Sequence, residues 1–315
     1  MIIGMRFNFK NILKEIIKLF NYCTLSQIIT NHKIPYTILL KHISSGDIKY
    51  INLFGQKLIN QKVINLFKKN IFENDYIHNI KVDNINFKMK FKDNAIDQPI
   101  YERIIGKREP STVAVLKSIV QEDFKILEIG ACYGYFSIIL SKLLKSKGQI
   151  ISIECLPRNY EILNNNLSLN NINNVETLNY FISSQNEANV FFEKNVRDPY
   201  ALIKRFKNNI KLDNEIKNSS KFDGVKSISI SNLLKSLNFN PNLIFMDIEG
   251  IEVDAIEDLS SNYLDKHKPI ILFEIHNDYY MGDKNLNYLL SILKNKNYML
   301  REIDGNILGY INEKN

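Results

Sequence analysis

Six carboxylates lie within fourteen residues of the chain, in the segment FMDIEGIEVDAIED that covers residues 245–258. Such a run could bind a metal ion, supply an acid and a base for catalysis, or form the solvent-exposed face of a helix. Asp247 and Glu249 come directly after the apolar run NLIFM, so we expect them at the end of a buried strand. At that place a carboxylate could remove a proton from a bound substrate.

The other four acids of this run fall in a segment with helical periodicity, residues 250–259. At about 100° per residue, its apolar residues share one face. Glu252 falls on that apolar face, in the first turn, where the helix dipole favours a carboxylate. It either hydrogen-bonds the preceding loop or reaches the bound substrate, and the sequence leaves both open. Three acids lie on the opposite face and are expected in solvent: Asp254, Glu257 and Asp258.

Glu274 and His276 end a later apolar strand, PIILFEIH. Histidine titrates near neutral pH, so His276 could act as a base, or it could be a hydrogen-bonded structural residue. Asp247 and Glu249 could hold a divalent cation through oxygen ligands, but the spacing shows no third ligand. We therefore predict no metal site. The predicted catalytic residues are Asp247, Glu249, Glu252 and His276.

Two more acids mark the ends of earlier strands. Glu128 precedes the tight turn GACYG, and Glu154 ends the next strand 26 positions later. Gly130 and Gly134 alone do not make the glycine patterns that cradle phosphates. Glu128 could accept from an ammonium group, and Glu154 stands where an acid accepts both hydroxyls of a ribose. A ribose acceptor without a phosphate cradle indicates S-adenosylmethionine as the cofactor.

These residues must be positioned by regular secondary structure, which the sequence predicts from about residue 98 onward. Apolar strands alternate with helical segments, which predicts an α/β fold with a mostly parallel sheet and helices on both faces. One of the strands is expected over residues 175–182, and two final strands around residues 304–306 predict a closing hairpin. In such a sheet, ligands bind outside the carboxyl ends of the strands, where the acids fall. The polar segment 193–225 is expected to be a loop or lid.

The first 97 residues have a different character. Apolar residues recur at helical spacing over residues 9–20 and again over 55–70, and residues 77–93 alternate as a hairpin does. We therefore expect a smaller α+β accessory region at residues 1–97 and a main domain at 98–315. The first helix is basic and could lie on a membrane surface, although such a stripe more often packs in a core or against a partner.

The composition sets the outer limits. The chain has 315 residues, 45% of them hydrophobic and 24% charged, which is ordinary for a soluble globular protein. No apolar run approaches the roughly 20 residues that span a bilayer. The three cysteines form no CxxC pair, so we expect no disulfide framework or zinc site, and a cytoplasmic setting. The net charge of +7 comes from scattered residues, which disfavours a nucleic-acid partner.

Several motifs resemble one enzyme family. ILEIGACYGYFSIIL (126–140) resembles the glycine motif of class I S-adenosylmethionine-dependent methyltransferases, whose sheet also ends in an antiparallel hairpin. More narrowly, the chain resembles the FkbM family. ISIECLPRNYEILNNNLSLNNINNV (151–175) is similar to that family's second-strand motif and next helix, and LIFMDIEGIEVDAI (243–256) matches its Asp-x-Glu-Gly-x-Glu signature. The resemblance spans about residues 100–311.

The resemblance implies a Rossmann-like sheet of seven strands and S-adenosylmethionine as the cofactor. Carried over by position, it implies eight cofactor-binding residues: Glu128, Gly130, Ala131, Gly134, Glu154, Leu156, Ser183 and Asp247. Cys155 and Leu156 stand where the family usually has Pro and Asn after the second acid, so Leu156 could pack on the adenine, but no polar contact is expected there. Ser231 and Asn232 replace a pair of aspartates, and we expect them to cap the following helix.

The resemblance also implies the reaction. We expect O-methylation of a hydroxyl on a glycan, a lipid-linked sugar or a secondary metabolite. One alternative is a nucleic-acid (RNA) methyltransferase, which the positive charge would suit. Another is a non-catalytic cofactor-binding or interaction module, which the departures at Cys155 and Leu156 would suit.

Overall fold

A computed structural model describes most of the chain after residue 76. The helices expected before residue 75, and most of the expected loop at 193–225, lie outside the described residues. The described residues are 77–91, 102–104, 106–145, 147–184, 186, 189–193, 222–280 and 283–311. The chain divides into two units, Met1–Val82 with Phe91–Arg108 and Asp83–Lys90 with Glu109–Asn315.

Both strands of the expected N-terminal hairpin are present. Strand β1 (His78–Val82) belongs to the first unit and β2 (Ile85–Met89) to the second, and Asp83 and Asn84 separate them. Buried and exposed residues alternate along each strand, as the sequence predicts. Within the first unit, Gly106 has a φ of +69°, and a Cβ there would lie 2.1 Å from the carbonyl oxygen of Lys81. Only glycine fits this turn.

The second unit is built on a sheet of seven strands in the order β11-β12-β10-β9-β3-β4-β5. The strands β5, β4, β3, β9 and β10 run parallel, while β12 pairs antiparallel with both β10 and β11. This confirms the predicted seven-stranded, mostly parallel sheet with a terminal antiparallel hairpin. The strand bounds are β3 (Lys125–Ile129), β4 (Gln149–Ile153), β5 (Val175–Leu178), β9 (Leu243–Met246), β10 (Ile270–Glu274), β11 (Met299–Ile303) and β12 (Asn306–Tyr310).

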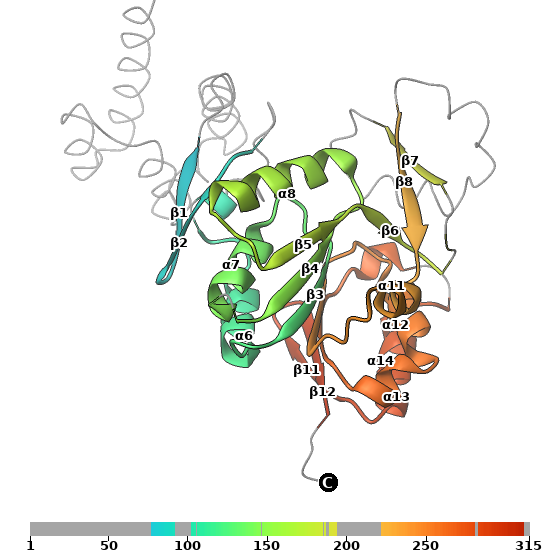
Figure 1. Cartoon of the computed structure of the whole chain (residues 1–315). Helices are drawn as coiled ribbons and strands as arrows, with labels where there is room; N and C mark the ends of the chain where they lie inside the picture. The colour runs from blue at the N-terminus through green and yellow to red at the C-terminus, as the bar shows by residue number, and fades with distance from the viewer. Residues whose placement is uncertain are drawn as a thin grey trace, which may run out of the picture. The chain divides into compact units, whose positions relative to one another are not determined.

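Helices cover both faces of this sheet, with α6 and α7 on one side and α11 to α14 on the other (Figure 1). Their bounds are α6 (Pro110–Ile119), α7 (Tyr135–Leu144), α8 (Pro157–Leu169), α11 (Ile230–Leu237), α12 (Glu252–Ser260), α13 (Tyr263–His267) and α14 (Leu286–Asn295). A short 3-10 helix spans Asn277–Tyr279. Because both faces are covered, the central strands read as continuous apolar runs, and every residue of β9 is buried.

The start of α11 differs from the expectation. Ser229 is the N-cap, and its side chain accepts from the main-chain N–H of Asn232. The predicted cap at Ser231 and Asn232 is therefore wrong, because the helix begins one residue before them at Ile230. The main-chain N–H of Ser231 instead donates to Asp258 on α12 at 2.7 Å.

The expected strand over residues 175–182 is also wrong as a single element. β5 ends at Leu178, and β6 (Tyr180–Ile182) joins a second sheet in the order β6-β8-β7, with β7 at Asn189–Glu193 and β8 at Phe222–Ile228. Asn179 stands at the break, and its side-chain amide donates to the carbonyls of Glu154 and Cys155. β8 begins inside the segment 193–225 that was expected to be a loop and continues beyond it to Ile228.

Asn166 of α8 and Asn170, the C-cap of that helix, bond the backbone of the hairpin's second strand and of the residue after it. Asn170 donates to the carbonyl of Lys88 at 2.7 Å and accepts from its N–H at 2.8 Å. Asn166 makes the same pair of bonds with the backbone of Lys90, at 3.1 and 2.7 Å. The two amides therefore satisfy the edge of β2 much as a neighbouring strand would.

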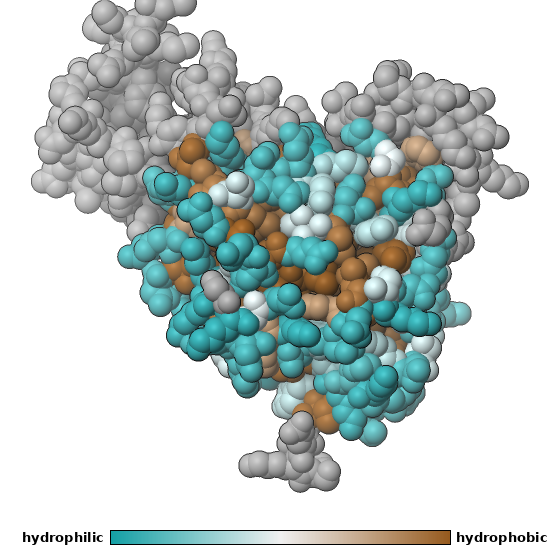
Figure 2. Space-filling model, viewed as in Figure 1, coloured by the Kyte–Doolittle hydropathy of each residue, from teal (hydrophilic) through white to brown (hydrophobic). Residues whose placement is uncertain are grey.

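The surface of the second unit is mixed in character. Figure 2 shows apolar residues gathered over the middle of the viewed face and hydrophilic residues around them. Among the described residues, no helix has both the length and the apolar character that crossing a membrane requires.

Candidate active site

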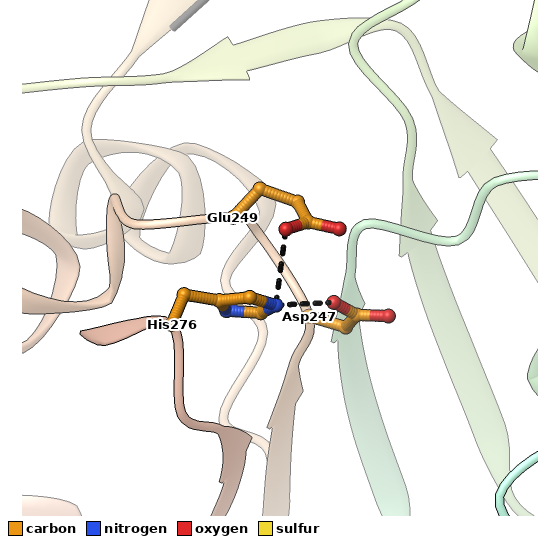
Figure 3. Close-up of side chains that lie close together, drawn as sticks. All are labelled: Asp247, Glu249 and His276. Carbon is orange, nitrogen blue, oxygen red and sulfur yellow. Dashed lines mark ion pairs between the residues drawn. The ribbon is translucent and has the colours of Figure 1, made fainter. Parts of the chain in front are cut away.

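The catalytic candidates of the sequence come together at the carboxyl ends of β9 and β10. Asp247 follows β9, and its main-chain N–H donates to the carbonyl of Ile129 on β3 at 3.0 Å. His276 comes two residues after the end of β10. Because β9 and β10 are parallel neighbours, their ends meet at one edge of the sheet. Figure 3 shows the side chains of Asp247 and Glu249 both pointing to the ring of His276.

The ring of His276 is surrounded by carboxyl groups. Its Nε2 atom lies 3.1 Å from Glu249 Oε2, 3.6 Å from Asp247 Oδ1 and 3.8 Å from Glu274 Oε2. Its Nδ1 atom lies 2.8 Å from Oε1 of Glu252. The His276 side chain is 10% exposed, so water screens these interactions weakly.

Glu252 is the most enclosed member of this group. It is fully buried, its Oε2 accepts from the N–H of Gly250 at 2.9 Å, and its Oε1 accepts from the N–H of Ile248 at 3.3 Å. The inward position predicted from periodicity is confirmed. Of the two open roles, the structure has Glu252 bonded to the motif loop, and the same carboxylate orients His276 through Nδ1.

The other three acids of α12 were expected to be fully in solvent, but each is half-buried and has a partner. Asp254 and Glu257 are half-buried and both pair with Lys284. Asp258 is also half-buried and accepts from the N–H of Ser231. The periodicity gave their side of the helix correctly, but α11 and the segment before α14 supply partners on that side.

The charges around His276 decide its protonation. Burial disfavours the imidazolium, but the hydrogen bond to Glu252 and the charges of Glu252, Glu249 and Asp247 outweigh it and raise the pKa of His276 to about 9. In the ligand-free protein at neutral pH, the ring is therefore a cation and already carries the proton that a base would take.

The backbone after β9 turns sharply to bring Glu249 back toward Asp247. Glu249 and Gly250 both have left-handed conformations, with φ of +57° and +97°. A Cβ on Gly250 would lie 2.5 Å from Cβ of Tyr279, so this position requires glycine. The left-handed conformation costs a non-glycine residue about 1 kcal/mol, and such strain is concentrated at functional sites.

The glycine turn after β3 lies against the same strand end. Gly130 has a φ of +89°, and a Cβ there would lie 1.9 Å from the carbonyl oxygen of Asp247. Gly134 is the N-cap of α7 with a φ of +86°. The N–H groups of Gly130 and Ala131 both donate to the carbonyl of Ile153 at 2.9 Å, which ties the turn to β4.

Glu154 closes the other side of this turn. Its Oε2 accepts from the N–H of Cys132 at 2.7 Å and its Oε1 from the N–H of Leu156 at 2.9 Å. Burial raises the pKa of Glu154 to about 7, although these hydrogen bonds oppose the shift. The carboxyl group predicted to accept ribose hydroxyls thus stands between the turn and the start of α8.

Glu128 lies deeper. It is 1% exposed, and its Oε2 accepts from the hydroxyls of Ser137 on α7, at 2.5 Å, and Ser152 on β4, at 2.6 Å. Burial raises the pKa of Glu128 to about 7. Neither serine was predicted as a site residue from the sequence. Ser152 directly faces Glu128 in the β3–β4 register, which the strand alignment could have shown.

The last two predicted cofactor residues, Leu156 and Ser183, lie near the second sheet, β6-β8-β7. Leu156 precedes α8 and packs, with Cys155, against a cluster of buried residues: Val190, Phe192 and Val225. Ser183 follows β6, and its N–H donates to the carbonyl of Ile228 at 3.1 Å. Ser183 was placed at the end of the third strand, but that strand ends at Leu178 because β6 leaves the main sheet.

The comparisons with solved structures give methyltransferases of low similarity. Methyltransferase FkbM from Methylobacillus flagellatus KT has 20% identity and a TM-score of 0.42, with 69% of this chain and 56% of that protein covered. The O-methyltransferase from Bacillus cereus, solved in complex with SAH, has 15% identity and a TM-score of 0.37, covering 65% and 82%. This chain therefore spans little more than half the length of the Methylobacillus protein. A comparison with curated proteins gives no match.

The comparison with protein families is more specific. A model described as protein-L-isoaspartate(D-aspartate) O-methyltransferase matches residues 60–180. A model described as methyltransferase FkbM domain matches residues 128–300, which is more than half of the chain and includes both the glycine turn and the acidic motif. The chain belongs to the FkbM family of S-adenosylmethionine-dependent methyltransferases.

Proposed function

We propose that this methyltransferase acts on a hydroxyl group of a glycan, a lipid-linked sugar or a secondary metabolite. The observation that supports it best is the group of carboxylates around His276, at the same edge of the sheet as the glycine turn. A hydroxyl must lose its proton when it is methylated, and proton acceptors at this edge would serve that step.

The residues at the turn suit S-adenosylmethionine, which when bound supplies a methyl group on a positively charged sulfur. Oε2 of Glu154 accepts the main-chain N–H of Cys132 and would have a lone pair left for a ribose hydroxyl. Oε1 already accepts from the N–H of Leu156 and, at 3.5 Å, from the side-chain amide of Asn159, which a ribose hydroxyl would replace. Asp247 would border the cofactor through its backbone contact with Gly130. Glu128 would act by holding α7 and β4 through Ser137 and Ser152.

The acidic side of the site would bind and orient the acceptor. Asp247 and Glu249 would accept the hydrogen bond of the hydroxyl and then its proton as the new carbon–oxygen bond forms. In the ligand-free protein the His276 imidazolium forms ion pairs with these two carboxylates through Nε2, and Glu252 keeps the ring in place through Nδ1. Holding the hydroxyl within about 3 Å of its reaction partner provides much of the rate.

The proposal is tested by incubating the purified chain with methyl-labelled S-adenosylmethionine and separate fractions of surface glycans, lipid-linked sugars, small metabolites, protein and RNA. We expect label in a glycan, lipid or metabolite fraction, and we expect it to resist mild alkali, as a methyl ether does and a methyl ester does not. Asp247→Asn should abolish the transfer, while Glu257→Gln, a change on the outer side of α12, should leave it unchanged. Label confined to RNA, or released by alkali, would overturn the proposal.

A further inference from the structure

The edge of the sheet at β9 and β10 gathers more acidic groups than its histidine can balance. Four carboxyl groups lie within 4 Å of the His276 ring, and even an imidazolium offsets only one of them: Asp247, Glu249, Glu252 and Glu274. Their side chains are between 0% and 29% exposed, so solvent compensates them poorly. Buried charges of this kind are usually paired or bound to a metal.

Three donor atoms at this edge converge on one point. Asp247 Oδ1, Glu249 Oε2 and His276 Nε2 all lie within 4.8 Å of one another, with 3.1 and 3.6 Å from Nε2 to the two oxygens. A cation that binds its ligands at about 2.1 Å keeps adjacent donors about 3 Å apart and opposite donors about 4.2 Å apart. The three atoms therefore already have the spacing of a metal's ligands.

The surroundings of these atoms also suit a metal. Glu252 fixes Nδ1 of His276 from the far side, and metal-binding histidines commonly have such a carboxylate partner. Glu252 is itself held by the N–H groups of Gly250 and Ile248. Asp247 Oδ1 is buried and, among the described residues, accepts no hydrogen bond. Leaving a buried acceptor unsatisfied costs about 1–3 kcal/mol, which a bound cation would remove.

We propose that Asp247, Glu249 and His276 bind a divalent cation, and that Mn²⁺ suits them better than Mg²⁺. Carboxylates suit both ions, but imidazole favours a first-row transition metal. The catalytic role of the cation rests on the proposed function, whereas its binding does not. On binding, the cation would displace the proton from Nε2 of His276 and take over its ion pairs with the two carboxylates. It would polarise the acceptor hydroxyl, and the hydroxyl proton would pass to the second, unligated oxygen of Asp247 or Glu249. His276 thus supplies the third ligand that the sequence spacing did not show.

The binding test uses the full chain, freed of metal with a chelator and then dialysed, in the absence of S-adenosylmethionine. Titration with MnCl₂, followed by calorimetry and by the loss of the free Mn²⁺ electron paramagnetic resonance signal, should give one ion per chain. Mg²⁺ should bind at least tenfold more weakly. No Mn²⁺ binding, or equal affinity for Mg²⁺, would overturn the proposal.

Variants locate the ion. His276→Ala and Asp247→Asn should each weaken Mn²⁺ binding at least tenfold, and Glu252→Gln should weaken it about 10- to 100-fold by releasing the ring. Glu257→Gln on the outer side of α12 is the matched control and should bind as the wild type does. Circular dichroism must first show that each variant is folded. Unchanged binding by folded His276→Ala would overturn the proposal and move the ion to the neighbouring carboxyl set, Glu109, Asp247 and Glu274.

The two proposals fail in different ways. Mn²⁺ binding without any methyl transfer to a hydroxyl would leave the metal site standing and overturn the proposed function. If the chain binds no Mn²⁺ but still methylates a hydroxyl in the presence of a chelator, the proposed function stands and the metal site is overturned.

Discussion

Replacing Glu252 by glutamine tests how the acidic motif is held together. The carboxylate is fully buried and accepts from the N–H groups of Gly250 and Ile248 and, when His276 is protonated at Nδ1, from the ring. Glutamine has nearly the same shape, but its NH₂ group can only donate. At least one buried donor then faces another donor, and the buried imidazolium loses its closest anion.

The size of the effect follows from these contacts. An unsatisfied buried donor costs about 1–3 kcal/mol, and removing one partner of a buried ion pair costs about 3–5 kcal/mol. The two overlap, so we expect Glu252→Gln to lower the free energy of unfolding by about 3–5 kcal/mol. That is a large share of the roughly 5–15 kcal/mol that stabilises a typical domain.

Urea denaturation followed by circular dichroism, at pH 7 in the presence of a chelator, measures this loss. Glu257→Gln is the matched control, because Glu257 lies on the same helix but pairs with Lys284 near the surface. Its expected loss is below about 1 kcal/mol. Equal losses for the two variants, within about 0.5 kcal/mol, would refute the reasoning that Glu252 holds the motif loop and His276.

Three further predictions concern the rest of the site and its frame. Gly130→Ala places a Cβ 1.9 Å from a backbone oxygen, whereas a Cβ at Gly305, which has a similar φ, meets nothing within 4 Å. Thermal unfolding should therefore show a loss of about 1 kcal/mol of stability for Gly305→Ala and of well over 2 kcal/mol for Gly130→Ala. Because burial raises the pKa of Glu154 to about 7 and ribose hydroxyls donate to its ionised form, calorimetry should show affinity for S-adenosylmethionine falling about tenfold per pH unit below 7. Glu154→Gln should bind more weakly and lose this dependence; affinity equal to that of the wild type would contradict the ribose assignment. Asn166→Ala removes a fully buried amide that bonds the backbone of Lys90, so urea denaturation should show a loss of about 2–4 kcal/mol in the free energy of unfolding. The loss should be smaller for Asn170→Ala, because Asn170 is more exposed; equal losses would contradict this expectation.

Periodicity and strand ends were enough to predict the main frame. The alternation of apolar runs and helical segments predicted the mostly parallel sheet and its closing hairpin, and the family resemblance implied its seven strands. The rule that ligands bind at the carboxyl ends of parallel strands placed Glu154, Asp247 and His276 at one edge. A helical projection alone showed that Glu252 faces inward, and the fully buried side chain confirms it.

Local pattern could not show where strands leave the sheet. Residues 175–182 were expected to form one strand, yet the strand breaks at Asn179, whose side-chain amide donates to the carbonyls of Glu154 and Cys155 just after β4. The start of β8 contains Asp223 and Gly224 and belongs to the polar, poorly periodic segment 193–225, which was expected to be a loop. Its partners are β6 and β7, so the strand exists because of pairing that the sequence does not display.

The contacts within the site were also beyond local pattern. Glu252 and His276 are 24 residues apart on different elements, and only the β9–β10 register brings them to 2.8 Å. For the same reason His276 did not appear as a third metal ligand beside Asp247 and Glu249. The left-handed conformation of Glu249 could not be predicted either, because the only sign of this turn in the sequence is the glycine that follows, Gly250.

Isothermal titration of the purified chain with S-adenosylmethionine and, separately, with NAD tests the central claim most directly. Both ligands carry an adenosine ribose that Glu154 could hold, but only NAD needs a phosphate cradle, which the glycine turn lacks. We predict one S-adenosylmethionine bound per chain and no measurable heat from NAD. Tight NAD binding without S-adenosylmethionine binding would contradict the account.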